Sequence, residues 1–408
     1  MSTPTKTVCV IGLGYIGLPT AALLAGKSYQ VIGVDINPKT VETINKGQIH
    51  IVEPDLDAFV RSAVSSGKLK AQTEPAYADI FMVCVPTPLS EKRDGIPQPD
   101  ISYVESAVKS IAPYLRDGNS VILESTSPVG TTVAMTKVLS GLGVDTSKIH
   151  IAYCPERVLP GKIMTELVEN DRVVGGITSS ASEAVCEFYK TFVRGEVIQT
   201  DAPTAEMCKL AENSYRDVNI AYANELSLIC ANAGINVTKL IELANRHPRV
   251  NILTPGVGVG GHCIAVDPWF VVAKDPEHAR LIHTARNVND FKTEWVITQV
   301  ANEIKSLQAS LKRKPTVVCF GLAFKPDIDD LRESPALLVA EKMAKMECEL
   351  LVVEPNIEDH DSFTLCDPVK AYDSADLLVF LVRHRQFADL VKRANIGSKT
   401  VLDYCGIL

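Results

Sequence analysis

Two stretches of this chain share one order of apolar and polar positions. Residues 6–37, KTVCVIGLGYIGLPTAALLAGKSYQVIGVDIN, predict an apolar strand, a glycine-containing turn, a helix, a second apolar strand and an acidic residue. Residues 315–356, PTVVCFGLAFKPDIDDLRESPALLVAEKMAKMECELLVVEPN, repeat that order. Each stretch is typical of the opening unit of a doubly wound parallel sheet. The pattern therefore predicts an α/β protein with two Rossmann-like doubly wound parallel-sheet domains.

Further apolar runs extend both predicted sheets. The first sheet gains strands from DIFMVCVPTP, NSVILEST and KIHIAYCPE, and the second gains strands from ADLLVFLV and KTVLDY. Between the sheets, residues 204–235 form a continuous helical pattern of about 30 residues, preceded by Pro203 and closed near Gly234. Apolar residues on more than one face of this helix favour a domain-spanning helix or a subunit interface over a solvated linker. We expect three regions, at 1–200, 201–310 and 311–408.

Composition narrows the protein class. Apolar residues make up 46% of the 408 residues and charged residues 22%, which is typical of a soluble globular protein. No run reaches about 18 uncharged apolar residues and the N-terminus lacks the apolar core of a signal peptide, so we expect a cytoplasmic protein without a membrane partner. A net charge of -8 argues against nucleic-acid binding. Eleven scattered cysteines without a CxxC pair indicate reduced thiols and no metal site.

The sequence GLGYIG carries Gly12, Gly14 and Gly17 in GxGxxG spacing, directly after a predicted strand and before a predicted helix. The first glycine permits the tight turn, the second lets a pyrophosphate approach the backbone, and the third allows close helix–strand packing. The next strand ends at Asp35, whose carboxylate can accept hydrogen bonds from the ribose hydroxyls and would repel a 2'-phosphate. These features favour NAD over NADP, with FAD binding or a purely structural Rossmann unit as the alternatives.

A cysteine behind four glycines, Cys263 in GVGVGGHCIAVDPWF, is the candidate nucleophile. Cysteines inside apolar runs, such as Cys9 and Cys319, are expected to be buried sulfurs. The glycines before Cys263 allow a ligand to come close and leave the sulfur uncovered, and Asp267 is positioned to serve a proton relay or orient a water. Because a thiol attacks a carbonyl carbon far more readily than an alcohol, a cysteine beside NAD implies an aldehyde stage.

Two further segments carry candidate chemistry. Lys209, Asn213 and Arg216 lie at i, i+4 and i+7 of the long helix and share a face, as either a solvated polar stripe or a substrate-binding and proton-accepting set. The turn FGLAFKPDIDDLRESP carries Lys325 and Arg332 after a parallel strand. Ligands bind at such turns, so these cations suit a phosphate, and ordinary surface salt bridges are an equal alternative.

Several motifs in this order resemble the nucleotide-sugar 6-dehydrogenase family, the UDP-glucose/GDP-mannose dehydrogenases, along essentially the whole chain. They are GxGxxG with Asp35, SxSPVG, CPERVLPG, EMCKLAENSYRDVN, GVGVGGHCIAVDP and GLAFKPDIDDLRES. The segments INKGQIHIVEPDL and NRHPRVNILTPGVGVGGHCIAVDPWF are most similar to the branch that acts on N-acetylated sugars. Pro160 and His262 stand where UDP-glucose dehydrogenases carry a carboxylate and a serine, which also favours that branch.

The resemblance implies an NAD-dependent, four-electron oxidation at C6 of UDP-N-acetyl-D-mannosamine to UDP-N-acetyl-D-mannosaminuronate, for a surface polysaccharide. UDP-N-acetyl-D-glucosamine, the C2 epimer, is the alternative substrate, and a non-catalytic nucleotide-sugar or NAD sensor is the alternative from another class. The three regions become an NAD-binding Rossmann domain, a central helical dimerisation region and a UDP-sugar-binding Rossmann-like domain. A homodimer built by the long helix is expected.

The resemblance also implies roles for individual residues. Cys263 is the nucleophile that forms the thiohemiacetal and thioester, Lys209 shuttles the proton, Asn213 donates a hydrogen bond, Asp267 assists, and Glu156 is linked to thioester hydrolysis. Cofactor contacts fall, beside the three glycines, on Tyr15, Ile16, Asp35, Thr87, Thr126 and Arg332. Substrate contacts fall, beside Lys209 and Asn213, on Arg157, Val158, Arg216, His247, Arg249, Gly260, Phe324 and Lys325. In the family, the arginine at Arg249 can serve the neighbouring subunit's site.

Overall fold

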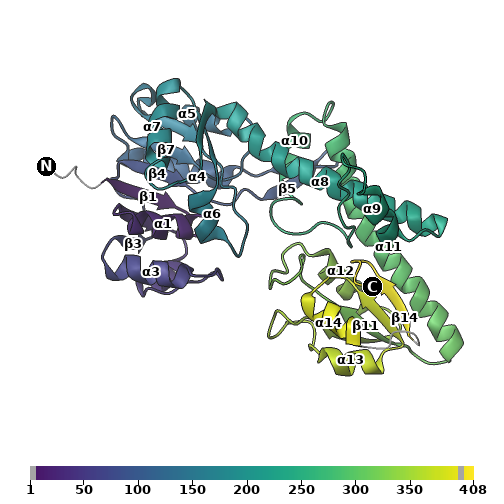
Figure 1. The fold of residues 1–408 in the computed structure, drawn as a ribbon. Coiled ribbons are helices and arrows are strands. Elements are labelled where there is room, and N and C mark those ends of the chain that lie inside the picture. The colour runs from purple at the N-terminus through teal and green to yellow at the C-terminus, as the bar shows by residue number, and fades with distance from the viewer. Residues whose placement is uncertain (1–5, 394–398) are drawn as a thin grey trace. The chain divides into compact units, whose positions relative to one another are not determined.

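The computed structural model describes residues 6–393 and 399–408. The chain divides into two compact units, each of which is described by itself (Figure 1). The first unit comprises Met1–Glu212 with Trp269–Lys274, and the second comprises Asn213–Pro268 with Asp275–Leu408. The boundaries expected near residues 200 and 310 stay a prediction.

An eight-stranded sheet forms the centre of the first unit. Its strands are β1 (Thr7–Ile11), β2 (Gln30–Val34), β3 (Leu69–Gln72), β4 (Ile80–Val83), β7 (Ser120–Leu123), β8 (His150–Tyr153), β9 (Arg172–Gly176) and β10 (Val197–Asp201), in the order β10-β9-β8-β7-β4-β1-β2-β3. The neighbouring strands β3, β2, β1, β4, β7 and β8 are parallel to one another. The three additional strands predicted for this sheet, which are β4, β7 and β8, are therefore confirmed. β9 runs antiparallel to β8, and β10 is parallel to β9. The sequence pattern did not predict this reversed pair.

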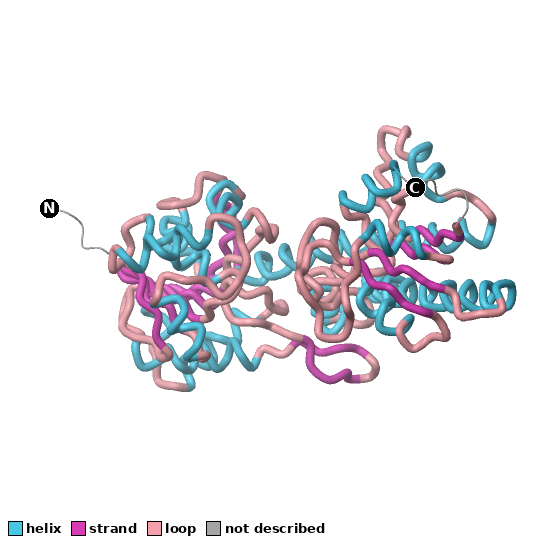
Figure 2. Tube along the Cα trace, turned by 90° about the horizontal axis from the view of Figure 1, so that it is seen from below, coloured by secondary structure: helices cyan, strands magenta, loops and turns pink. Residues whose placement is uncertain are grey.

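Alternation along β1 explains why helices cover both faces of this sheet. Val8 and Val10 join one buried cluster, whereas Cys9 and Ile11 join another, because successive strand side chains point to opposite faces. The first cluster includes residues of α1 (Gly17–Gly26), α3 (Leu56–Ser65), α6 (Ile163–Glu169) and α7 (Ser179–Tyr189). The second includes residues of α4 (Ser102–Ile111) and α5 (Thr131–Gly141). Figure 2 shows these strands in magenta among cyan helices.

Smaller elements complete the first unit. They are α2 (Pro38–Asn45), the antiparallel hairpin of β5 (Leu89–Arg93) and β6 (Ile96–Pro99), and the short 3-10 helices η1 (Ala112–Tyr114) and η2 (Thr146–Lys148).

The register of the central strands aligns the residues that follow them. Ile11 pairs with Val83, Val83 with Leu123, and Leu123 with Tyr153. The residues directly after these partners are therefore in one row at the carboxyl edge of the sheet. They are Gly12, Cys84, Glu124 and Cys154. Ligands of doubly wound folds bind at this edge.

The second unit contains a four-stranded parallel sheet. Its strands are β11 (Thr316–Phe320), β12 (Glu349–Val353), β13 (Leu377–Phe380) and β14 (Thr400–Asp403), in the order β12-β11-β13-β14. This confirms the predicted second sheet and both of its later strands. Residues of α11 (Arg280–Leu311) and α12 (Pro335–Met343) pack with one face, and residues of α13 (Pro368–Ser374) and α14 (Arg385–Arg393) pack with the other.

The predicted long helix is α8 (Ala202–Ala233). Pro203 lies in its first turn, where the missing N–H costs no helical hydrogen bond, and Gly234 follows its end with φ +68°. In the second unit α8 packs on α11 through buried polar contacts. Arg286 Nη1 lies 2.8 Å from Asp217 Oδ1, and Lys292 Nζ donates to Ser227 Oγ at 2.7 Å. Because an unpaired buried charge is costly, these contacts specify the register of the two helices.

Two short helices, α9 (Val237–Ala244) and α10 (Asp267–Lys274), lie between α8 and α11 in the sequence. None of the described helices is both long and apolar enough to cross a membrane.

Candidate active site

The glycine turn after β1 has the geometry expected of a dinucleotide-binding loop. Gly12 adopts φ +91°, and a Cβ on it would lie 2.5 Å from the carbonyl oxygen of Cys84. A Cβ on Gly17 would lie 1.8 Å from the carbonyl oxygen of Gly12, whereas a Cβ on Gly14 would meet nothing within 4 Å. The outer two glycines thus allow close packing of the chain on itself. The exposed middle glycine leaves the backbone open to a pyrophosphate.

Asp35 follows β2 and is tied to the glycine turn. One carboxylate oxygen accepts from the backbone N–H of Leu13 at 3.1 Å, and the other accepts from the N–H of Asn37 at 2.9 Å. The side chain is half-buried, so its carboxylate is held in place while part of it stays accessible. This arrangement fits the ribose-binding role predicted for Asp35.

Other predicted cofactor residues lie at the same edge of the first sheet. Tyr15 is half-buried, and Ile16 is the N-cap residue of α1. Thr87 Oγ1 donates to the carbonyl oxygen of Thr126 at 2.6 Å, which joins the turns after β4 and β7. The residues of the first unit therefore fit NAD, with the glycine turn toward its pyrophosphate and Asp35 toward a ribose.

Glu156 and Lys209 are brought together from different elements of the first unit. Glu156, in the loop after β8, is buried, and its Oε1 accepts from the backbone N–H of Arg157 at 2.7 Å. Its Oε2 accepts from Arg172 Nη1 at 2.5 Å. Lys209 Nζ donates to the carbonyl oxygen of Glu156 at 2.8 Å. The predicted proton shuttle and the predicted hydrolytic carboxylate thus belong to one cluster.

The loop that carries Arg157 and Val158 is held by carboxylates that the sequence analysis did not single out. Arg157 Nη2 pairs with Glu212 Oε1 of α8 at 2.7 Å. The two oxygens of the buried Glu53 accept from the backbone N–H groups of Gly161 and Ile163, each at 2.8 Å. Val158 packs against the buried cluster around α1. The segment INKGQIHIVEPDL contains Glu53, so the signal lay in a quoted motif whose acidic residue received no role.

Cys263 differs from the other cysteines in its surroundings. All eleven cysteines lie in the described part of the chain, and Cys263 is the one that is exposed. Burial raises the pKa of the Cys9 thiol to about 11 and that of the Cys154 thiol to about 12, which keeps these sulfurs protonated and unreactive. The carbonyl oxygen of Cys263 accepts from the N–H groups of Val266 and Asp267 at 3.2 and 2.8 Å. Cys263 therefore lies one turn before α10, which begins at Asp267.

Asp267, the first residue of α10, is buried and held by α8. Asn213 Nδ2 donates to Asp267 Oδ2 at 2.5 Å, and both side chains are buried. Asn213 lies one helical turn after Lys209 on α8, as the spacing predicted. The structure thus joins two of the predicted catalytic residues by a hydrogen bond within the second unit.

The glycines before Cys263 pack against the chain itself. A Cβ on Gly260 would lie 2.5 Å from the carbonyl oxygen of Glu333, and a Cβ on Gly261 would lie 2.9 Å from Phe324 Cε2. Gly258 adopts φ +147°, and its Cβ would lie 2.3 Å from Thr293 Oγ1. The close approach that we expected for a ligand is made in the structure by the turn after β11. Cys263 itself is an exposed residue, and the expectation that its sulfur is open to a ligand stays a prediction.

The turn after β11 carries the two predicted phosphate-binding cations. Lys325 is exposed, whereas Arg332 makes two contacts with Asp330, at 2.8 Å from Nε and 2.6 Å from Nη2. His247 Nδ1 accepts from the backbone N–H of Arg249 at 3.3 Å in the segment after α9. His247, Arg249 and Arg216 are exposed side chains of the second unit.

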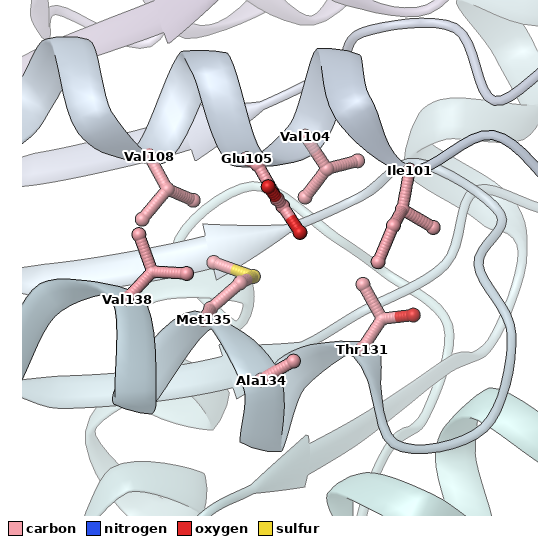
Figure 3. Close-up of a pocket in the computed structure, with 8 residues that line it drawn as sticks. All are labelled: Ile101, Val104, Glu105, Val108, Thr131, Ala134, Met135 and Val138. Atoms are coloured by element: carbon pink, nitrogen blue, oxygen red, sulfur yellow. The ribbon is translucent and has the colours of Figure 1, made fainter.

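A small apolar gap between α4 and α5 is separate from these residues (Figure 3). None of the predicted site residues lines it. Its lining residues are Ile101, Val104, Glu105, Val108, Thr131, Ala134, Met135 and Val138.

Comparison with known proteins identifies the family. Residues 6–193 match the NAD binding domain of the UDP-glucose/GDP-mannose dehydrogenase family, residues 203–291 match its central domain, and residues 318–408 match its UDP binding domain. The chain belongs to this family. Its NAD binding domain is therefore the first region of the chain, in agreement with the glycine turn and Asp35.

Three members of the family illustrate the similarity. The UDP-N-acetyl-D-mannosamine dehydrogenase of Yersinia pestis is 56% identical, with 98% of this chain and 99% of the relative covered. The NDP-N-acetyl-D-galactosaminuronic acid dehydrogenase of Ralstonia nicotianae is 52% identical, with 98% and 96% covered. The solved structure of the UDP-N-acetyl-mannosamine dehydrogenase of Staphylococcus aureus is 43% identical, with a TM-score of 0.87 and 98% and 99% covered.

Proposed function

We propose that this protein is an NAD-dependent UDP-N-acetyl-D-mannosamine 6-dehydrogenase that oxidises C6 of the sugar to the carboxylate. The observation that carries the proposal is the exposed Cys263 in the turn before α10, in a chain of a nucleotide-sugar dehydrogenase family. A sensor of nucleotide sugars would need the pockets without this thiol. The relative from Yersinia pestis, similar over its full length, supports UDP-N-acetyl-D-mannosamine as the substrate.

The overall reaction removes two hydrides from one carbon and adds one water oxygen. The C6 alcohol first loses a hydride and a proton to become an aldehyde. Cys263 Sγ then bonds to the aldehyde carbon while the thiol proton passes to the aldehyde oxygen, and loss of the second hydride and of the hydroxyl proton from this thiohemiacetal leaves a thioester. Water attacks the thioester carbon, the C–S bond breaks, and the acid and the thiol are released. Bound NAD supplies the hydride acceptor, and two NAD are consumed per sugar.

Residues of the chain would handle the protons of these steps. Lys209 would take the alcohol proton and then stabilise the developing oxyanion, with its Nζ anchored on the carbonyl oxygen of Glu156 at 2.8 Å. Asp267, held by Asn213 at 2.5 Å, would orient a proton relay for the thiol. Glu156 would activate the hydrolytic water.

Recognition of the nucleotide falls to the second unit in this proposal. The match of residues 318–408 to a UDP binding domain supports binding of UDP there, with Lys325 in the turn after β11 as a phosphate ligand. Arg157, Val158, Arg216, His247, Arg249, Gly260 and Phe324 are the proposed sugar and nucleotide contacts. The similarity to a galactosaminuronic acid dehydrogenase is a reason to test separately the configuration at C2, which carries the N-acetyl group, and at C4, which carries a hydroxyl, because one pocket contact separates epimers by only about 1 to 3 kcal/mol.

The first test counts NADH formed per sugar consumed. Purified protein with NAD is given UDP-N-acetylmannosamine, UDP-N-acetylglucosamine, UDP-N-acetylgalactosamine or UDP-glucose in parallel. We expect two NADH per sugar, with UDP-N-acetylmannosamine preferred over each other sugar by at least about tenfold in kcat/KM. One NADH per sugar would contradict the thioester step, and no NADH with any sugar would contradict the proposed activity.

We further propose that the protein is a homodimer built on α8. Tyr215, Tyr222 and Ile229 recur every seven residues on this helix and are 71, 55 and 58% exposed. A seven-residue repeat of large exposed side chains forms one stripe along a helix, which a second copy of the same helix would cover. In such a dimer Arg249 could reach the site of the partner subunit, as the family resemblance implies.

Disrupting this stripe is expected to separate the subunits. Tyr222→Glu with Ile229→Glu places two charges on the stripe, and burying them in a helix–helix interface is unfavourable. Light scattering after size-exclusion chromatography is expected to give the mass of a monomer, against twice that mass for the wild type. Val369→Glu, at a 55% exposed position on α13, is the matched control and is expected to leave the mass unchanged. A double variant with the mass of the wild type would contradict this interface.

A further inference from the structure

Three charged side chains are buried together in the first unit, and the sequence analysis assigned a role to one of them. Glu124, Glu156 and Arg172 are 3, 6 and 1% exposed. Glu124 directly follows β7, Glu156 lies three positions after the end of β8, and Arg172 is the first residue of β9. Because charged groups are rarely buried without a partner or a function, this cluster requires an explanation.

The reversed strand β9 is what brings Arg172 to this edge of the sheet. Ala152 pairs with Gly176, and Tyr153 pairs with Gly175, in the antiparallel sense. Continuing this register places Arg172 opposite Glu156, in agreement with the 2.5 Å contact between Arg172 Nη1 and Glu156 Oε2. A parallel β9 would have placed its first residue at the opposite edge.

The contacts of Arg172 and Glu156 fix both side chains. Arg172 Nη2 donates to the carbonyl oxygen of Leu167 at 3.1 Å, and its guanidinium lies 5.4 Å from the ring centre of Tyr189. Glu156 accepts from donors on both oxygens, the guanidinium and the backbone N–H of Arg157. Donors on both oxygens therefore fix the orientation of the Glu156 carboxylate.

The surroundings of Glu124 are different. Tyr189 Oη lies 2.6 Å from one carboxyl oxygen, and Cys84 Sγ lies 3.3 Å from the other. A hydroxyl and a thiol can each accept a hydrogen bond as well as donate one, so a protonated Glu124 is accommodated. Burial, followed by the charge of Glu156, raises the pKa of Glu124 to about 7, against the opposing effects of Arg172, Tyr189 and Cys84.

The charges buried in this cluster distinguish the carboxyl group of Glu124 from that of Glu156. One guanidinium neutralises one carboxylate, and a second buried carboxylate would leave a net negative charge in a low-dielectric environment. The ionisable groups around Glu124 are Glu156 and Cys154 from β8 and its loop, Arg172 from β9, Tyr189 from α7 and Cys84 from the turn after β4. The guanidinium contacts Glu156, and Glu124 is the carboxyl group whose pKa is raised.

We propose that Arg172 is a positioning residue that orients Glu156 and balances its charge for thioester hydrolysis, with Glu124 as the second buried carboxyl group beside them. The inference rests on the proposed function, because Glu156 would accept a proton from the water that attacks the thioester of Cys263. As that water oxygen bonds to the thioester carbon and the C–S bond breaks, the proton passes from the water to Glu156. The role of Arg172 is confined to this step.

The test separates hydrolysis from the preceding oxidations. Wild type, Arg172→Gln, Arg172→Lys, Glu124→Gln and the double variant Arg172→Gln/Glu124→Gln are mixed with UDP-N-acetylmannosamine and NAD between pH 6 and 9.5. Stopped-flow absorbance follows NADH, chromatography follows the acid, and intact-protein mass spectrometry follows acylated Cys263. Arg194→Gln, which removes an exposed arginine whose Nη1 pairs with Glu169 at 2.9 Å, is the matched control.

We expect Arg172→Gln to keep a burst of two NADH per site and then release acid at least tenfold more slowly, with the acylated enzyme accumulating. The pH of half-maximal acid release is expected to rise by at least one unit, because two buried carboxyl groups then remain without a cation. Removing the second carboxyl group in the double variant is expected to reverse most of that rise. Arg172→Lys is expected to retain more hydrolysis than Arg172→Gln, because it keeps the charge.

Several outcomes would overturn the inference. They are an equal loss of burst and acid release in both Arg172 variants, an unchanged pH profile, or a double variant with the profile of Arg172→Gln. If Arg172→Gln does not fold, Arg172→Lys carries the test, and acid release and acylation of Cys263 equal to the wild type in that variant would overturn the inference. A wild type that forms no acid would contradict the proposed function itself, whereas an active wild type with one of the outcomes above contradicts only the role of Arg172.

Discussion

Cys263→Ser is expected to reduce acid formation by at least about 10³-fold, within the range found when a catalytic nucleophile is removed. A serine hydroxyl stays protonated near neutral pH and is a poor nucleophile without an activating base. Cys263 is an exposed cysteine in the turn before α10. The variant is expected to stall at or before the aldehyde, with at most one NADH per sugar.

The measurement is the rate of uronate formation, with the mass of the intact protein as a second readout. Wild type quenched during turnover is expected to carry the acyl group on Cys263, and the variant is expected to carry none. Cys366→Ser is the matched control, because Cys366 is a partly exposed cysteine in the second unit, outside the predicted site. Acid formation by Cys263→Ser within tenfold of the wild-type rate would remove the nucleophilic role.

Gly17→Ala is expected to weaken NAD binding by at least about 100-fold and to destabilise the first unit. The added Cβ would lie 1.8 Å from the carbonyl oxygen of Gly12 and 3.0 Å from its carbonyl carbon. These are backbone atoms of the turn itself, so α1 must move away from β1 or the turn must change its conformation. Overpacking of this kind costs about 1 to 3 kcal/mol and occasionally more, and the moved backbone no longer matches the pyrophosphate.

Substitutions at two other glycines of the same segment distinguish a loss of stability from a direct block of NAD binding. Gly14→Ala meets nothing within 4 Å, so we expect an unchanged melting temperature with weaker NAD binding, because the methyl group occupies the approach to the backbone. Gly26→Ala also meets nothing within 4 Å and lies at the end of α1, so it is expected to leave NAD affinity unchanged. Melting temperatures and calorimetric titration with NAD test all three variants. Wild-type affinity in Gly17→Ala would contradict the role of the turn.

Most elements were predictable from the sequence because their patterns are local. The strands of both sheets are short apolar runs, and the glycine turn, Asp35 and the long helix α8 were predicted from spacing alone. The reversed pair β9 and β10 was not predicted, because an apolar run such as RVVGG indicates a strand but not its direction. Direction depends on the connection through α6 and on the pairing partner, which local pattern does not contain.

In the candidate site, too, local spacing predicted some features and the tertiary structure added the others. Spacing on one helix indicated that Lys209 and Asn213 share a face, and the structure adds their partners, the carbonyl oxygen of Glu156 and the carboxylate of Asp267. Arg172 and Glu124 received no role because each is a single charged residue at the end of an apolar run. Glu53, distant in sequence from the loop it holds, was missed for the same reason.

The sequence by itself determined the fold class, the position of the cofactor turn and the glycine-rich segment that carries Cys263. These properties depend on residues within about one element of each other, where backbone geometry relates spacing directly to position. Only the tertiary structure decided which charges are buried together. The antiparallel β9 places Arg172 opposite Glu156, and the aligned ends of β4, β7 and β8 place Glu124 beside them. Charges must be paired where folding removes them from water, and here that burial is produced by strands that are far apart in the sequence.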